Sequence, residues 1–234
     1  MSGKYLRLLF VGAPGVGKGT YSGRAAVLLG CHAISSGELL RKEVSEGTAI
    51  GRQVKGLIEK GDFVSDELIT KIVAQHIRSL SADAERSNGY ILDGYPRNIS
   101  QSTALWTSGD IQIDHVINLT QPRDVIIKKL SSRRSCPDCG FVYNFASIDM
   151  GGIKMEPLKP KVDGVCDKCG CTKSLVTRKD DEIDIVTKRQ DEYKAVATPL
   201  LQFYREKGIL HEFPILGGTQ THLPKLVELI SKLD

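Results

Sequence analysis

No run of apolar residues in this 234-residue chain is long enough to span a bilayer. The sequence also contains no internal repeat, no low-complexity segment and no strong excess of basic charge, since its net charge is only +4. The first absence argues against a membrane protein. The last argues against a nucleic-acid-binding protein, whose basic residues would gather on one face.

The start of the sequence shows no targeting pattern. The chain opens with MSGKYLRLLF and enters an apolar stretch almost at once, so we expect no signal or transit peptide. Six cysteines without a secretion signal indicate a reducing compartment rather than a disulfide framework, and we expect a cytoplasmic protein. The composition, 41% apolar and 26% charged, suits one globular domain that carries smaller lobes.

A glycine-rich stretch, FVGAPGVGKGT (residues 10–20), lies between an apolar run, LRLLFV, and a helical pattern, YSGRAAVLLG. Strand, glycine loop and helix in this order predict a loop whose backbone amides hold phosphates. Gly12, Gly17 and Lys18 match the pattern G-x-x-x-x-G-K. Gly19 follows where Ser or Thr is usual, and the hydroxyl comes one place later at Thr20. The alternative is a glycine-rich turn with a solvated lysine.

The rest of the chain alternates short apolar runs with helical patterns. GYILDGYP, HVINL and GILHEF predict strands, and residues 180–207 predict a long helix. Strands that alternate with helices indicate an α/β fold with a parallel sheet covered on both faces.

Residues 135–177 interrupt this alternation with glycines, prolines, lysines and five of the six cysteines. Two C-x-x-C pairs, in CPDCG and CDKCG, supply Cys136, Cys139, Cys166 and Cys169. Four thiolates suit a tetrahedral structural Zn²⁺, which would hold together a lobe too small for its own core. A redox dithiol is the alternative for either pair alone, and Cys171 could replace Cys169 as a ligand.

Five arginines lie at the ends of predicted elements: Arg41, Arg97, Arg133, Arg178 and Arg189. Each one alone would be interpreted as a solvated surface charge. Arginine binds phosphate oxygens in pairs and stays charged, and phosphoryl transfer mainly needs placement and positive charge around the transferred group. Their joint placement therefore predicts a phosphoryl-transfer site, with cations that converge on an anionic small molecule.

The motifs GAPGVGKGT, ISSGELLR, LDGYPRNISQ, TRKDD and KRQDEY, in this order and spacing, resemble the adenylate kinase family over nearly the whole chain. The resemblance implies a P-loop NTPase-type parallel sheet flanked by helices, with a nucleoside monophosphate (NMP)-binding lobe and a zinc-containing lid. It places the core at 1–35, 66–134 and 178–234, the NMP-binding lobe at 36–65 and the lid at 135–177. The implied reaction is ATP + AMP ⇌ 2 ADP with Mg²⁺. The implied enzyme is a monomer that binds ATP, AMP and ADP, but neither nucleic acid nor a membrane.

The same resemblance assigns the site residues. The implied catalytic residues are Lys18, Asp93, Arg97, Arg133, Arg178 and Arg189. The implied ATP-binding residues are Gly15, Val16, Gly17, Lys18, Gly19, Thr20, Lys129, Arg133, Val142, Tyr143 and Gln220. The implied AMP-binding residues are Ser36, Arg41, Asp62, Phe63, Val64, Gly94, Tyr95, Pro96, Arg97, Gln101, Arg178 and Arg189. Asp93 resembles the acid that orders the waters of Mg²⁺, and Asp180 and Asp181 are expected to pair with lid arginines.

Two features depart from the family pattern. Many relatives carry an arginine that stacks on the ATP adenine where this chain has Lys129, which leaves the triphosphate base selectivity open. The stretch SIDMGGIKMEPL between the cysteine pairs is longer than in compact zinc lids, and we expect a flexible surface loop there. The functional alternatives are a GTP:AMP or pyrimidine nucleoside monophosphate kinase, a nucleic-acid-binding module with an ATPase switch, and an inactive relative.

Overall fold

The computed structural model describes residues 5–60, 62, 64–81, 87–109 and 111–233. A five-stranded sheet in the order β2-β3-β1-β4-β9 lies at the centre of this part, and all of its pairings are parallel. Its strands are β1 (Leu6–Val11), β2 (His32–Ser35), β3 (Gly89–Asp93), β4 (His115–Thr120) and β9 (Leu210–Pro214). The predicted α/β fold with a parallel sheet is confirmed.

Helices cover both faces of the sheet because each face is apolar. One apolar cluster joins the sheet to α1 (Lys18–Leu29), α6 (Arg123–Ser131) and α8 (Thr219–Ser231). The other joins it to α4 (Asp66–Ser81), α5 (Ile99–Ser108) and α7 (Ile183–Glu206). The inner strand β3 is buried along its whole length, as expected for a parallel strand between two helical layers.

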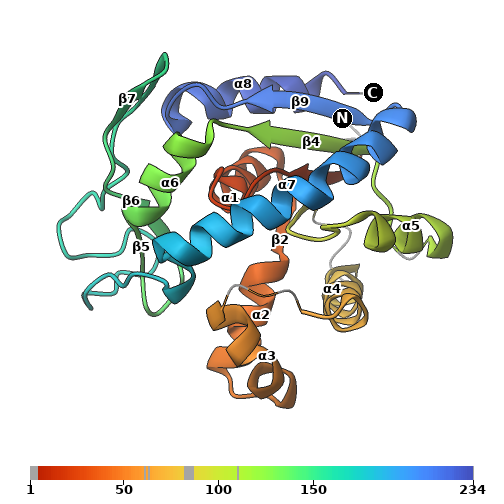
Figure 1. Ribbon diagram of the computed structural model, residues 1–234, viewed down its shortest axis with the longest axis horizontal. Coiled ribbons are helices and arrows are strands. Elements are labelled where there is room, and N and C mark those ends of the chain that lie inside the picture. Colours follow the sequence, from red (N-terminus) through yellow and green to blue (C-terminus); the bar gives the residue numbers. More distant parts are fainter. Residues whose placement is uncertain (1–4, 61, 63, 82–86, 110, 234) are drawn as a thin grey trace.

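Two groups of elements project from this core (Figure 1). The first is α2 (Ser36–Ser45) and α3 (Ala49–Lys60), which extend away from α8. The two helices approach closely at Gly51, where a Cβ atom would lie 2.0 Å from the Glu43 carbonyl oxygen. This helix pair falls within the predicted NMP-binding lobe.

The second group follows α6. It contains the antiparallel pair β5 (Arg133–Ser135) and β6 (Val142–Asn144), the hairpin β7 (Ile148–Met150) and β8 (Ile153–Met155), and the short 3₁₀ helix η2 (Lys179–Asp181). We call the chain from 133 to 144, which contains β5 and β6, together with residues 159 to 177, the cysteine lobe. Its own small apolar cluster is built on Cys136, Tyr143 and Cys166.

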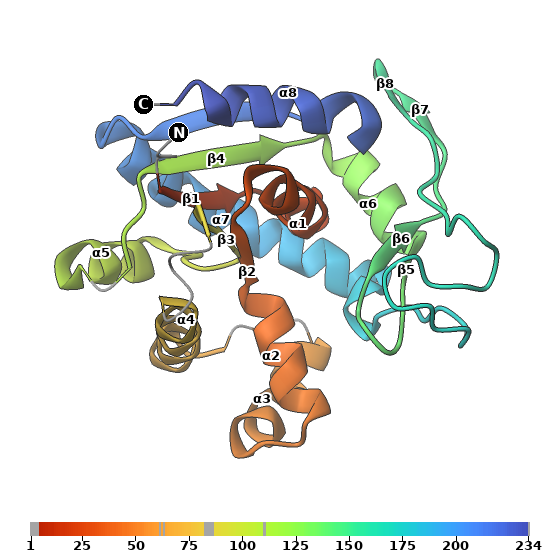
Figure 2. The ribbon, with the colours of Figure 1, turned by 180° about the vertical axis from the view of Figure 1, so that it is seen from behind.

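The β7–β8 hairpin differs from the flexible surface loop that we expected. Figures 1 and 2 show it rising from the cysteine lobe along α6 to the level of α8. Ile148, Ile153 and Met155 are buried and belong to the core cluster of α1, α6 and α8. Among the helices of the described residues, none is long and apolar enough to cross a membrane.

Candidate active site

The glycine loop after β1 requires glycine at two of its positions. At Gly12, with φ of 146°, a Cβ atom would lie 2.4 Å from the Leu119 carbonyl oxygen. At Gly15, with φ of 84°, it would lie 2.5 Å from Leu130 Cδ1. Residues with side chains rarely adopt such φ values, so glycine is the residue that fits this backbone conformation. The loop ends where α1 begins, at Lys18.

Lys18 points back across this loop. Its Nζ donates hydrogen bonds to the carbonyl oxygens of Gly12 (2.7 Å) and Ala13 (3.2 Å). Burial lowers the pKa of Lys18 to about 8, against the opposing effect of the Asp93 carboxylate. The ammonium is held by neutral carbonyls, which leaves its charge available to a bound anion.

Asp93 ends β3 beside the phosphate loop, and its carboxylate lies close to Gly19. A Cβ atom on residue 19 would lie 3.3 Å from Asp93 Oδ2, which is tighter than ordinary van der Waals contact. Burial raises the pKa of Asp93, while Lys18 and Arg97 favour its charged form. A carboxylate at this place is what an octahedral Mg²⁺ would use through its waters, and the Thr20 hydroxyl begins the same helix.

A cavity of about 1180 Å³ brings the predicted residues together. Its wall includes all the predicted ATP- and AMP-binding residues except Val16, Ser36 and Tyr95, and Phe63, which lies outside the described residues. The Val16 side chain is buried in the core. The hydroxyl of Ser36 donates to the Gly94 carbonyl at 2.7 Å, and that of Tyr95 pairs with the Thr70 hydroxyl at 2.7 Å.

Of the three arginines at the side of the cavity next to the cysteine lobe, two are held by acids and one by a hydroxyl. Arg133 Nε donates to Asp181 Oδ2 at 2.7 Å, and Arg189 Nη1 donates to Asp180 Oδ2 at 2.6 Å. Arg178 Nε donates to the Ser135 hydroxyl at 2.9 Å. Burial, followed by the charge of Arg133, lowers the pKa of Arg178 to about 9. This clustered positive charge favours a polyphosphate.

Arg97 and Gln101 form a second polar group on the monophosphate side. Arg97 Nε donates to the Gly94 carbonyl at 2.6 Å, and burial lowers the pKa of this guanidinium. Gln101 accepts from the Arg97 amide at 2.6 Å and donates to Asp66 Oδ1 at 2.5 Å. Each end of the Gln101 side-chain amide has one protein partner, which leaves one lone pair on the oxygen and one N–H for an adenine edge.

Asp62 and Lys129 also have partners in the protein. Asp62 Oδ1 accepts from Lys188 Nζ of α7 at 2.5 Å, and the two form an ion pair. Lys129 Nζ donates to the Val16 carbonyl at 2.9 Å and to Gln121 Oε1 at 2.8 Å. Burial, together with the charge of Arg133, lowers the pKa of Lys129 to about 8. The ammonium of Lys129 lies against the phosphate loop.

The chain matches the family model described as adenylate kinase over residues 10–209. It belongs to the adenylate kinase family. It is 36% identical to adenylate kinase 1, chloroplastic, of Arabidopsis thaliana, over 97% of this chain and 78% of that one. It is 37% identical to the adenylate kinase of Thermodesulfovibrio yellowstonii, over 97% of this chain and all of that one. A third relative, the adenylate kinase of Archaeoglobus fulgidus, is 37% identical over 88% of this chain and 89% of that one.

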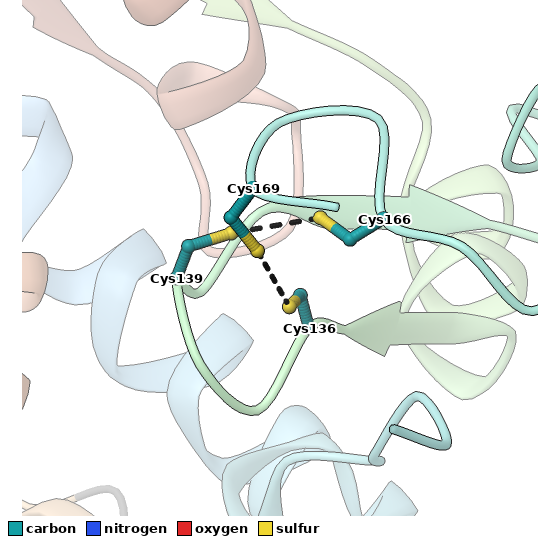
Figure 3. Close-up of side chains that lie close together, drawn as sticks. All are labelled: Cys136, Cys139, Cys166 and Cys169. Atoms are coloured by element: carbon teal, nitrogen blue, oxygen red, sulfur yellow. Dashed lines mark hydrogen bonds between the residues drawn. The ribbon is translucent and has the colours of Figure 1, made fainter. Parts of the chain in front are cut away.

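In this adenylate kinase family member, the four predicted zinc ligands come together from two loops (Figure 3). The Sγ atoms of Cys136, Cys139, Cys166 and Cys169 all lie within 4.8 Å of one another. Those of Cys136 and Cys169 are 3.6 Å apart, as are those of Cys139 and Cys166. Tetrahedral Zn²⁺ with bonds of about 2.3 Å separates its sulfurs by about 3.8 Å, so the donor set fits the metal.

Some residues of the site were not found from the sequence. Gln121 joins Lys129 to the chain after β9, because its Nε2 donates to the Ile215 carbonyl at 3.0 Å. The Asp66 carboxylate accepts a hydrogen bond from the Gln101 side chain. Asn98 caps α5, because its side-chain oxygen accepts from the backbone N–H of Gln101 at 2.8 Å. The cap position of Asn98, just before a helical pattern, was the one available sequence signal among these. The contacts of Gln121 with Ile215 and of Asp66 with Gln101 show no local pattern, because these partners are distant in sequence.

Proposed function

We propose that the chain transfers the γ-phosphoryl group of ATP to AMP and forms two ADP. The observation that carries this proposal is the convergence of Lys18 and five arginines, from separate segments, on one cavity beside a phosphate loop. The family of the chain supports it. A cavity with this many cations suits two polyphosphates that face each other rather than a single neutral ligand.

The residues act by placement and charge. Lys18 and the loop amides would hold the β- and γ-phosphates of ATP, and Arg97 with Arg41 would hold the phosphate of AMP. Arg133, Arg178 and Arg189 would surround the transferred group, where charge develops in the transition state. Mg²⁺, held through Asp93 and Thr20, would supply positive charge at the ATP phosphates when bound. No protein base is needed, because the attacking phosphate oxygen of AMP is already ionised.

A nucleotide panel tests the proposal against a GTP:AMP or a pyrimidine nucleoside monophosphate kinase. Each of ATP, GTP, CTP and UTP would be assayed with each of AMP, GMP, CMP and UMP. We expect the highest kcat/KM for ATP with AMP. Turnover of CMP or UMP in preference to AMP would reject the assignment. The cytoplasmic location, the monomeric state and the domain boundaries given above stay predictions.

We also propose that the cysteine cluster holds a structural Zn²⁺. Although burial opposes it, the backbone amides of Cys169 and Lys168 lower the pKa of Cys166 to about 6. Four thiolates within 4.8 Å of one another repel, so holding all four ionised at neutral pH requires a bound cation. Cys171 lies outside the set of four, which supports Cys169 as the ligand.

Metal removal gives a prediction that separates stability from chemistry. Chelation, or Cys139→Ser, should lower Tm by roughly 5 °C or more, because the cysteine lobe has little apolar core of its own. Cys171→Ser is the matched control and should leave metal content and Tm unchanged. Metal analysis of the freshly purified protein, with thermal unfolding before and after chelation, checks this. Protein without zinc would contradict the assignment.

The lowered pKa of Lys18 predicts a pH dependence. A lysine with pKa of about 8 loses its charge as the pH rises through 8, so kcat/KM for ATP should fall above that pH. The lowered pKa of Lys129, also about 8, acts in the same direction. Initial rates between pH 7 and pH 10, at saturating AMP, measure the profile. A profile that stays flat to pH 10 would mean that both ammonium groups keep their protons in the enzyme–AMP complex.

A further inference from the structure

The β7–β8 hairpin is anchored on the core although it belongs to the segment between the cysteine pairs. Ile148 is 1% exposed and Ile153 is 2% exposed, and both belong to the apolar cluster that contains residues of α6 and α8. The cysteines pack in a separate cluster. The hairpin is thus fixed to the core by its own buried side chains.

The hairpin meets the core at the turn that leads into α8. Lys154 forms an isolated parallel β-bridge with Gly217. The sulfur of Met155 accepts a hydrogen bond from Gln121 Nε2 at 3.7 Å, and the same nitrogen donates to the Ile215 carbonyl. These contacts hold β8 beside residues 215–217, just before the predicted base-contacting residue Gln220.

The hairpin and this turn form one end of the cavity. Lys154, Met155 and Glu156 line it together with Gly217 and Gln220. The lining residues from α2 and α3 belong to elements that Figure 1 shows well apart from β7 and β8. With the phosphates of a triphosphate at the phosphate loop, its nucleoside fits the end that the hairpin bounds, while the monophosphate fits the other.

Lys129 does not cover the base in this arrangement. Its ammonium donates to the Val16 carbonyl and to Gln121 Oε1, so it is engaged at the phosphate loop. A base placed beside Gln220 must then be held by other groups. The hairpin reaches the same turn through the β-bridge between Lys154 and Gly217.

We propose that the β7–β8 hairpin forms the wall against which the base of the nucleoside triphosphate packs. The hairpin then determines affinity and base selectivity for the triphosphate and leaves the monophosphate unaffected. Gln121 is a positioning residue, since it joins Met155 of the hairpin to Lys129 at the phosphate loop. This inference rests on the proposed function, because it assigns the substrates to the two ends of the cavity.

A shortened hairpin tests the inference. Residues 149–154 would be replaced by Asn-Gly, because Ile148 and Met155 are cross-strand partners and a two-residue turn can join them. This removes the Lys154–Gly217 bridge and the buried Ile153, and it keeps the buried Ile148 and Met155. We expect KM and calorimetric Kd for ATP to rise about tenfold, with those for AMP changed less than twofold. The preference for ATP over GTP, in kcat/KM, should fall by about the same factor.

A methionine pair supplies the matched control. Met155→Ala removes the side chain that contacts Gln121 and should raise KM for ATP, whereas Met150→Ala alters the exposed end of the same hairpin and should not. This pair decides the question if the shortened protein does not fold. Unchanged ATP binding in a folded shortened protein, or an equal loss for ATP and AMP, would overturn the inference. A wild-type protein without ATP:AMP activity would instead reject the proposed function.

Discussion

Lys18→Met is expected to lower kcat by about 10³-fold, because an ammonium at the β- and γ-phosphates is worth roughly 3–5 kcal/mol in the transition state. Methionine keeps most of the length of the side chain and removes the charge. The structure already places this ammonium on the carbonyls of Gly12 and Ala13, at the surface of the cavity. A coupled assay for ADP formation measures the loss.

The same variant should not be less stable at pH 7. The folded pKa of Lys18, about 8, lies below its ordinary value of 10.5, so the folded protein holds this proton unfavourably. The unfavourable contribution is fully present below pH 8 and is relieved as the pH rises from 8 to 10.5. Tm of Lys18→Met should therefore equal or exceed that of the wild type at pH 7. Full activity, or a lower Tm together with a small loss of activity, would contradict the assignment.

Lys128→Met is the control for this substitution. Lys128 is an exposed lysine on α6, next to Lys129, and it does not line the cavity. We expect wild-type activity from Lys128→Met. An equal loss in both variants would show that removing any positive charge from this region lowers the rate.

Arg133→Ala is expected to lower both activity and stability. The arginine lies at the lid side of the cavity, and an arginine that clamps the transferred phosphoryl group is worth about 10³-fold in kcat. It also pairs with Asp181, whose side chain is fully buried. Leaving that carboxylate without its partner costs about 3–5 kcal/mol, which a fall in Tm would report.

Two further variants separate the two effects. Arg133→Ala with Asp181→Ala removes the buried carboxylate as well, so Tm should recover while kcat stays low. Arg134→Ala alters the next residue of β5. The Arg134 side chain does not line the cavity, and its Nη1 donates to the Arg133 carbonyl at 2.7 Å. It should leave kcat within about twofold of the wild type. Recovery of kcat in the double variant would mean that Arg133 acts through stability alone.

The sequence predicted the features whose cause is local. The glycines of the phosphate loop, the strand before it and the C-x-x-C pairs are each specified within a few residues, and the structure confirms the sheet and the cysteine cluster. The prediction of a surface loop at residues 147–158 was wrong, because these residues form a hairpin whose Ile148 and Ile153 side chains are buried. Their apolar partners lie in α6 and after β9, and no short pattern encodes contacts over such separations.

The engagement of Lys129 could not be predicted for the same reason. Its acceptors are the Val16 carbonyl, 113 positions away, and the amide of Gln121. Gly19 is the opposite case, since the departure from the usual motif was plain in the sequence but its cause was not. In the structure the Asp93 carboxylate, at the end of β3, would lie 3.3 Å from a Cβ atom at residue 19.

Because the β7–β8 hairpin is anchored on the core, a dye attached to it can serve as a fixed point when movement of the cysteine lobe is measured by the distance between two dyes. Burial raises the pKa of Cys31 to about 11, so its thiol reacts slowly with maleimides at neutral pH, and the four clustered thiols would be protected by zinc. In a Cys171→Ser background, a dye at Asp149→Cys should keep a constant distance to a dye at Lys232→Cys when nucleotides are added. A dye at Lys161→Cys, an exposed position in the cysteine lobe, should change its distance to the dye at Lys232→Cys.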